Sequence, residues 1–328
     1  MKRIITVITA IAMIASAMSF CAVGVVAAGD FSYSIADGEV TITKYNGTAV
    51  AVEVPSVVEG LPVTIIGDGA FRFNSTVKSV VIPEGVRTVM TRAFDYCTGL
   101  ENVVLPQSLT QIGEFVFNQC IALEAVKLPD TITAMGSCVF SGCVALKSVN
   151  LPNSLEKMPN STFSGCKSLE SMVIPEGYTS IGAGTFGNCI SLTFVEIPEG
   201  VESLGMNAFN GCSALTELFL PKSVASIGNN AFANTEVTIA GYEGSFAHSY
   251  AVENAMSFKV VEDSDDVILG DLDGDMTVNA KDVNIIRRVV AGVIPMTEQM
   301  LRSADLDKDG PVNGKDSNFL SRKTAGVI

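Results

Sequence analysis

The stretch PEGYTSIGAGTFGNCISLTFVEI, residues 175–197, is repeated in outline along most of the chain. Proline returns every 23 residues from Pro83 to Pro221, and phenylalanine keeps the same interval from Phe71 to Phe232. Cysteine does so from Cys97 to Cys212, and a leucine follows each of these cysteines three residues later. Such a period, with apolar residues in fixed phase, predicts a solenoid, because one coil cannot bury its own apolar face and must stack on the next.

The residues before each proline predict a short strand. Just before the quoted stretch, Met172 and Ile174 face one side while Ser171 and Val173 face the other, as successive residues of a strand do. Pro175 ends the strand because proline has no amide hydrogen to donate. We therefore expect parallel strands from successive coils to lie side by side.

After the turn, Ile181 begins the outer side of the coil, and Phe186 and Cys189 return to the core. The strand, the turn and the phased Phe, Cys and Leu resemble the BspA-type branch of bacterial leucine-rich repeats, over residues 54–258. The resemblance implies an α/β-type repeat solenoid with a 23-residue period and parallel strands. Pro159 departs from the pattern, since it replaces the usual glycine.

Both ends of the solenoid need a cap, because a terminal coil would otherwise expose its apolar face and its strand edge. Residues 29–65 form the predicted amino-terminal cap, in which FSYSIADGEVTITKY alternates around Asp37 and Gly38 as a hairpin does. The repeats occupy residues 66–239. Residues 240–262 form the carboxy-terminal cap, which resembles that of the BspA-type family.

Composition excludes several function classes. The net charge is −14, which argues against nucleic acid and against anionic membrane surfaces, since both attract basic patches. Charged residues make up 17% of the chain and hydrophobic residues 48%, which fits a well-buried fold rather than disorder.

Residues 1–28 are typical of a secretory signal peptide. Lys2 and Arg3 precede a long apolar run, and small residues lead up to cleavage after Ala28. A retained membrane anchor is the alternative, because the run is nearly long enough to span a bilayer. A lipoprotein signal at Cys21 is disfavoured by the bulky Phe20 before it. We expect a secreted protein whose mature form has no membrane segment.

The chain has eight cysteines, of which six belong to the repeat, Cys21 lies in the signal and Cys138 is the odd one. One cysteine per coil, beside Phe and Leu, predicts a column of buried free thiols that act as small hydrophobes. Partial disulfide bridging between neighbouring coils stays open, because secretion permits it. Metal binding by these cysteines is not expected, since no CxxC cluster occurs.

A second repeat follows the acidic linker 263–268. Residues 271–294 match residues 305–328 at 14 of 24 positions, and each copy begins with a loop rich in oxygen ligands. Ca²⁺ prefers six to eight oxygen ligands, and this spacing wraps one loop around one ion, so two calcium ions are expected. The first loop offers Asp271, Asp273, Asp275, Thr277, Asn279 and Asp282; the second offers Asp305, Asp307, Asp309, Pro311, Asn313 and Asp316.

The two loops differ at the position that needs a left-handed backbone. The second loop has Gly310 there, whereas the first has Met276. A non-glycine residue costs about 1–2 kcal/mol in that conformation. We therefore predict that the first loop binds calcium more weakly.

Each loop is followed by a helical pattern, with Ile286 among the residues expected on its buried face. Residues 269–328 resemble a type I dockerin, a small all-α calcium-binding module that docks onto cohesin domains of cellulosomal scaffoldins. The resemblance places the cohesin contacts at Ala280, Lys281, Arg287, Arg288, Gly314, Lys315, Ser321 and Arg322. Ordinary solvation of the helix is the alternative for the basic residues among them.

Catalytic residues are hard to place in the solenoid. The single histidine, His248, lies within the expected cap, and no nucleophile and base can be assembled around it. Glu84, Glu176 and Glu199 recur after the prolines, where a turn rather than a reaction would place them. We do not expect an enzyme.

The outward strand positions are mostly small or apolar, and the chain has no Trp to form a sugar-binding platform. Phe194 and Phe219, one coil apart, are the exposed aromatic residues expected to suit a protein partner. These features together predict a secreted, non-catalytic cellulosome-associated protein. Its solenoid would act as a protein-interaction or adhesion surface for an unknown protein or cell-surface ligand. The alternative is a component that binds or degrades polysaccharides.

Overall fold

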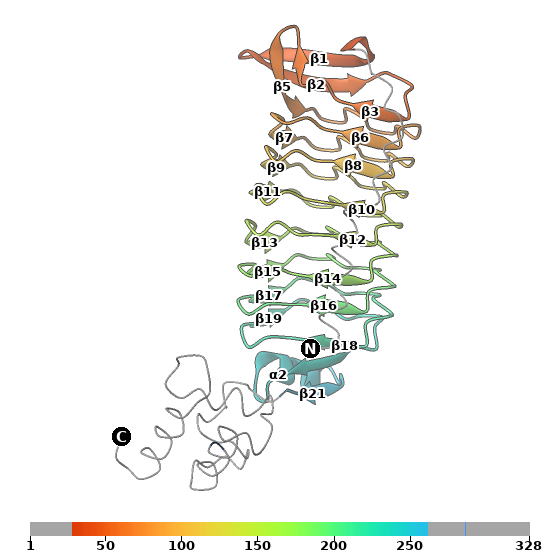
Figure 1. Cartoon of the computed structure of the whole chain (residues 1–328). Coiled ribbons are helices and arrows are strands. Elements are labelled where there is room, and N and C mark those ends of the chain that lie inside the picture. Colours follow the sequence, from red (N-terminus) through yellow and green to blue (C-terminus); the bar gives the residue numbers. More distant parts are fainter. Residues whose placement is uncertain (1–27, 262–285, 287–328) are drawn as a thin grey trace, which may run out of the picture. The chain divides into compact units, whose positions relative to one another are not determined.

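The computed structural model describes residues 28–261 and Ile286. The chain divides into two units, Met1–Lys259 and Val260–Ile328. The first unit is a stack of coils with a 23-residue period and parallel strands, so the predicted fold class is confirmed (Figure 1). In the second unit, Ile286 is helical and buried, as predicted.

A hairpin lies near the start of the described part of the first unit. Strand β1 (Phe31–Ala36) pairs antiparallel with β2 (Glu39–Tyr45). Asp37 and Gly38 between them both have positive φ, of 53° and 78°. This backbone matches the twist of the two strands, and glycine adopts it without steric cost. The hairpin is preceded by a 3-10 turn, Ala28–Asp30, and followed by β3 (Ala51–Glu53), β4 (Val57–Val58) and β5 (Leu61–Ile66).

Each coil contributes two short strands, whereas the repeat alone predicts one. We call the strands that precede the prolines the pre-proline ladder. The second strand of most coils is followed by a glycine, and these glycines form the glycine column: Gly67, Gly113, Gly136, Gly182, Gly205 and Gly228. The strands at this place in each coil are called the pre-glycine ladder. The pre-proline ladder comprises β6 (Ser79–Val81), β8 (Asn102–Val104), β10 (Ala125–Val126), β12 (Ser148–Val149), β14 (Ser171–Val173), β16 (Phe194–Glu196) and β18 (Glu217–Phe219). The pre-glycine ladder comprises β7 (Thr88–Val89), β9 (Gln111–Ile112), β11 (Ala134–Met135), β13 (Lys157–Met158), β15 (Ser180–Ile181), β17 (Ser203–Leu204) and β19 (Ser226–Ile227).

The core is a column of phenylalanine rings. From Phe71 to Phe232 the rings of successive coils stack with centroids 4.8–5.7 Å apart and planes within 18° of parallel. This distance follows from the spacing of hydrogen-bonded strands, about 4.8 Å, which sets the rise of each coil. Tyr45 stacks on Phe71 at 5.2 Å and so closes the column at its amino-terminal end.

The carboxy-terminal end of the column is closed by β20 (Thr238–Gly241), α2 (Phe246–Glu253) and β21 (Phe258–Val260). Ser245 caps α2 by accepting a hydrogen bond from the backbone N–H of His248 at 3.2 Å. Tyr250 of this helix packs edge-on against Phe232, with centroids 6.1 Å apart. Among the residues described, none forms a helix of the length and hydropathy that crossing a bilayer requires.

Candidate functional site: outward surfaces of the solenoid

The pre-proline ladder presents one candidate surface. The central residue of its strands is buried, as Val80, Met172 and Val195 illustrate, so the residues on either side face outward. The outward residues are Ser79, Val81, Asn102, Val104, Ala125, Ser148, Ser171, Val173, Phe194, Glu196, Glu217 and Phe219. Apart from Asn102, Glu196 and Glu217, they are small or apolar. The surface therefore offers few groups that could act on a substrate.

The two aromatic residues expected on this surface differ from each other. Phe194 is 42% exposed, as predicted. Phe219 is only half-buried rather than exposed, because Tyr242 packs edge-on against its ring at 5.7 Å. Tyr242 belongs to the carboxy-terminal cap, and its contact with Phe219 could not be read from the repeat. The expectation of an exposed pair is therefore correct for Phe194 and wrong for Phe219.

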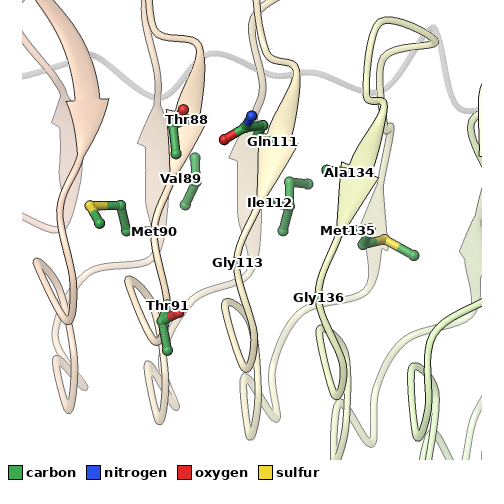
Figure 2. A pocket seen from close by; sticks show the side chains of 10 residues that line it. All are labelled: Thr88, Val89, Met90, Thr91, Gln111, Ile112, Gly113, Ala134, Met135 and Gly136. Atoms are coloured by element: carbon green, nitrogen blue, oxygen red, sulfur yellow. The ribbon is translucent and has the colours of Figure 1, made fainter.

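A second candidate is an open hollow of about 380 Å³ over β7, β9 and β11 (Figure 2). Figure 2 shows Met90 and Met135 at opposite ends of the hollow with Gly113 between them. The complete lining is Thr88, Val89, Met90, Thr91, Gln111, Ile112, Gly113, Ala134, Met135 and Gly136. These residues come from three adjacent coils of one ladder, so they form the floor of a depression and not a closed cavity.

The hollow arises from the glycine column. A Cβ on Gly113 would lie 2.5 Å from the backbone nitrogen of Thr91, so the close approach of the coils excludes a side chain there. Met90 stands at the same place in the preceding coil, and its side chain is 41% exposed. An apolar depression with methionine walls suits an apolar side chain of a protein partner, since methionine adapts its shape to what it contacts. The repeat pattern did not reveal it, because it depends on how side chains of different coils stand together.

The hollow carries no catalytic group. None of its ten lining residues is an acid, a base or a nucleophile that titrates near neutral pH. Two groups considered for catalysis elsewhere have structural partners. The carboxylate of Glu84 accepts hydrogen bonds from the backbone N–H groups of Gln107 and Ser108, at 2.8 and 3.1 Å.

His248 also has a packing role. Its Nδ1 accepts a hydrogen bond from the N–H of Gly244 at 3.1 Å, and its ring stacks on Phe258 with centroids 4.5 Å apart. The imidazole therefore holds helix α2 to the strand that follows it. This arrangement agrees with the interpretation of His248 as part of the cap.

The expected calcium ligands between Asp271 and Asp282 and between Asp305 and Asp316 lie outside the described residues. The expected cohesin contacts Ala280, Lys281, Arg287, Arg288, Gly314, Lys315, Ser321 and Arg322 lie outside them as well. These sites remain predictions from the sequence.

Comparison with protein families gives two matches. The BspA type leucine rich repeat region matches residues 64–191 and 136–251, with six copies. The dockerin type I domain matches residues 269–323. Neither of these families is catalytic. A comparison with curated proteins finds no match.

Among the solved structures similar to the solenoid are two leucine-rich repeat proteins. A leucine-rich repeat protein of T. pallidum is 34% identical, with a TM-score of 0.56, over 58% of this chain and 90% of that one. A leucine-rich repeat protein of Bacteroides ovatus is 24% identical, with a TM-score of 0.52, over 72% of this chain and 67% of that one. The second likeness concerns the fold alone.

Proposed function

Because this chain belongs to the BspA-type leucine-rich repeat family and carries a type I dockerin domain, we propose that it is a secreted, non-catalytic subunit of a cellulosome-like complex. Its dockerin binds a cohesin of a scaffoldin in a calcium-dependent way. Its solenoid contacts another protein or a cell-surface ligand. The domain boundaries expected from the sequence, with the dockerin at residues 269–328 and the signal at residues 1–28, belong to this proposal.

The observation that carries the proposal is the pair of loops in register within the matched dockerin region. Each loop has four carboxylates and one amide oxygen, the hard oxygen ligands that calcium prefers. Without a cation these carboxylates repel one another, so calcium binding and folding of the module are coupled. Calcium therefore controls whether a cohesin-binding surface exists.

The solenoid supports the second half of the proposal. Leucine-rich repeats form extended surfaces that bind proteins. Here the exposed Phe194 and the methionine-walled hollow offer apolar contacts, and no titratable side chain lines the hollow. A surface of this kind suits recognition better than bond cleavage.

The docking function is tested by titrating the full chain with a panel of cohesin domains, by calorimetry, in calcium and in excess chelator. We expect at least one cohesin to bind in calcium and to lose at least about tenfold in affinity in chelator. The double variant Asp271→Ala and Asp305→Ala should lose affinity to the same degree in calcium. Asp263→Ala, which removes an acid of the linker outside both loops, is the matched control and should bind normally. Binding that is unchanged by the chelator would refute calcium-dependent docking.

The alternative function is that of a component that binds or degrades polysaccharides. A second assay distinguishes it from the protein-interaction role. The full chain is incubated with plant polysaccharides, and both release of sugars and retention on the insoluble polymer are measured. We expect neither. Release of reducing ends that grows with protein concentration would favour the alternative over a protein-interaction role.

A further inference from the structure

Each coil holds two residues in the left-handed backbone conformation, two positions before and two positions after the stacked phenylalanine. From the fourth coil onward, Gly or Asn holds most of these positions. The ten residues there are Cys138, Gly142, Ser161, Gly165, Gly184, Asn188, Asn207, Gly211, Asn230 and Asn234. Glycine and asparagine are the ordinary choices there, because they adopt positive φ most readily.

The first three coils break this rule. Phe73 and Tyr96 occupy the later position with φ of 62° and 58°, and Arg92 and Phe115 occupy the earlier position with φ of 57° and 58°. Bulky residues are disfavoured in this conformation, and strain of this kind tends to collect at functional sites. The backbone conformation therefore does not explain why these side chains are present.

These side chains stand together as one cluster, which we call the arginine-aromatic edge: Arg72, Phe73, Arg92, Tyr96 and Phe115. The guanidinium of Arg72 lies 4.4 Å from the centre of the Phe73 ring, and that of Arg92 lies 5.1 Å from the centre of the Phe115 ring. The rings of Phe73 and Tyr96 are 5.5 Å apart and tilted by 42°. Phe73 is 62% exposed and Tyr96 43%, so the edge is open to a partner.

A buried carboxylate holds the arginines in place. Asp95 is 2% exposed, and its Oδ2 accepts a hydrogen bond from Nε of Arg72 at 2.9 Å. Nε of Arg92 lies 4.0 Å from the same oxygen, and Asn118 donates to Oδ1 at 2.8 Å. Two guanidinium groups thus share one carboxylate, which leaves the edge with a positive charge. Both guanidinium groups have further N–H groups that can donate to a carboxylate of a partner.

The charge of the edge contrasts with that of the chain. Residues 28–261 contain three arginines, Arg72, Arg87 and Arg92, and all of them lie in the first two coils. The chain as a whole has a net charge of −14. Within the edge, Arg72 and Arg92 outnumber the one carboxylate that they share, so an acidic group of a partner finds a local excess of positive charge there.

We propose that the arginine-aromatic edge binds an acidic segment of a partner protein, with a carboxylate on the guanidinium groups and an apolar side chain against Phe73 and Tyr96. Arginine and aromatic residues dominate the energetic centres of protein interfaces. Arg92 directly follows Thr91 of the hollow's lining in the chain, so the edge and the hollow share the second coil. A sugar chain is a poorer fit, since the tilted rings form no flat platform and each arginine already lies over a ring face.

The proposal rests on the proposed role of the solenoid as a protein-interaction surface, and its test uses the calcium-loaded full chain. A displayed library of random short peptides is selected on the chain, and selected peptides are synthesised and titrated by fluorescence polarisation. We expect the selected sequences to combine Asp or Glu with an apolar residue. Exchange of the peptide's acids for amides should weaken binding by at least about tenfold. Rising salt should weaken it as well.

The variants use residues that this solenoid itself places at these positions. Phe73→Asn with Tyr96→Asn copies Asn188 and Asn234, and Arg92→Asn copies Asn207 and Asn230. These changes relieve the backbone, so we expect the thermal midpoint to be kept or raised while peptide affinity falls at least about tenfold. Loss of binding together with kept stability separates a binding role from a structural one. Lys167→Gln, at an exposed lysine outside the edge and outside the hollow, is the control and should bind normally. Phe194→Ser is measured beside it to show whether the pre-proline ladder takes part in binding.

Three results would overturn the inference. Selection of basic peptides, or of no peptide at all, would contradict the proposal that the edge binds an acidic segment. Loss of binding in Phe194→Ser with normal binding in the edge variants would move the contact to the pre-proline ladder, and the proposed interaction role would survive. A dimer in sedimentation that the edge variants dissociate would assign the edge to a second copy of this chain.

Discussion

At the scale of single residues, the cysteine column has a more definite role than filling space. All seven described cysteines are free thiols, and the six of the repeat are buried. Each of these six donates its Sγ–H to the carbonyl oxygen of a phenylalanine 26 residues earlier, at 2.9–3.2 Å. The thiols therefore tie each coil to the one before it. Burial raises their pKa values, to about 12 for Cys97 and for Cys212.

This burial predicts a loss of stability in alkali. A thiol whose folded pKa lies above its ordinary value of 9.0 contributes stability that is complete below that value. The contribution is lost as pH rises from there towards the folded pKa. We expect the free energy of unfolding to fall above about pH 9, by up to ~1.4 kcal/mol per pH unit for each buried thiol. Denaturant titrations at a series of pH values measure the slope.

Cysteine variants separate the thiols from other groups that titrate in alkali. The triple variant Cys120→Ala, Cys143→Ala and Cys166→Ala is less stable at neutral pH, because it creates cavities. Its stability should nevertheless fall less steeply with pH than that of the unaltered chain. Cys138→Ala, at the half-buried cysteine outside the column, should keep nearly the full slope. Equal slopes in all three proteins would show that the column does not cause the loss.

At the scale of elements, the pre-glycine ladder is interrupted once within the coils described. Strands β7, β9 and β11 form one sheet with β1, β2 and β5, and β13, β15, β17 and β19 form another. In the coils on either side of the interruption, the glycine after the strand donates its N–H to a backbone carbonyl of the preceding coil. Gly136 donates to Ile112 at 2.8 Å, and Gly182 donates to Met158 at 2.9 Å. Pro159 holds that position in the fifth coil and has no N–H to donate. The stacked pair Phe140 and Phe163 keeps the coils together at this point.

We predict that Pro159→Gly restores the missing link without a large change in stability. The new hydrogen bond to the carbonyl of Met135 is worth about 1 kcal/mol, and the greater freedom of glycine in the unfolded chain costs about as much. The amide of the new glycine should therefore exchange slowly with deuterium, like that of Gly136, while the denaturation midpoint stays nearly constant. Ala134→Gly, which adds flexibility without a donor at the break, is the control and should only lower stability. Rapid exchange at residue 159 would mean that the hydrogen bond to the carbonyl of Met135 does not form.

At the scale of the whole molecule, the chain consists of two units, and we expect different interactions to stabilise each of them. The solenoid is held by contacts between neighbouring coils and by caps that close the ring column, where Tyr45 and Tyr250 cover its ends. For the matched dockerin region, by contrast, the proposed calcium loops would make folding depend on a bound cation. The two units should therefore respond differently to calcium.

Differential scanning calorimetry of the full chain tests this expectation. With calcium we expect two transitions, and excess chelator should lower or abolish one of them while the other stays within about 2 °C. Asp305→Ala in calcium should reproduce the effect of the chelator in part. A single transition that shifts as a whole on chelation would show that the two units unfold together.

The sequence alone was sufficient for the fold class, because a 23-residue period with phased Phe, Cys and Leu leaves stacking as the way to bury the apolar face. It was sufficient for the hairpin at Asp37 and Gly38 too, since turn residues act through their own backbone. The dockerin was recognisable for a similar reason, because its ligand spacing lies within one short loop.

Only the tertiary structure decided which surfaces are available. The second strand of each coil, the cover of Tyr242 on Phe219 and the hollow between Met90 and Met135 all depend on residues of different coils or of a cap. Identifying the arginine-aromatic edge also required the backbone angles. In the sequence nothing marks Phe73 and Tyr96 as unusual, and only the structure shows that both have positive φ. A periodic sequence specifies the core that every coil shares, whereas a binding surface depends on how the residues that do not repeat come together in space.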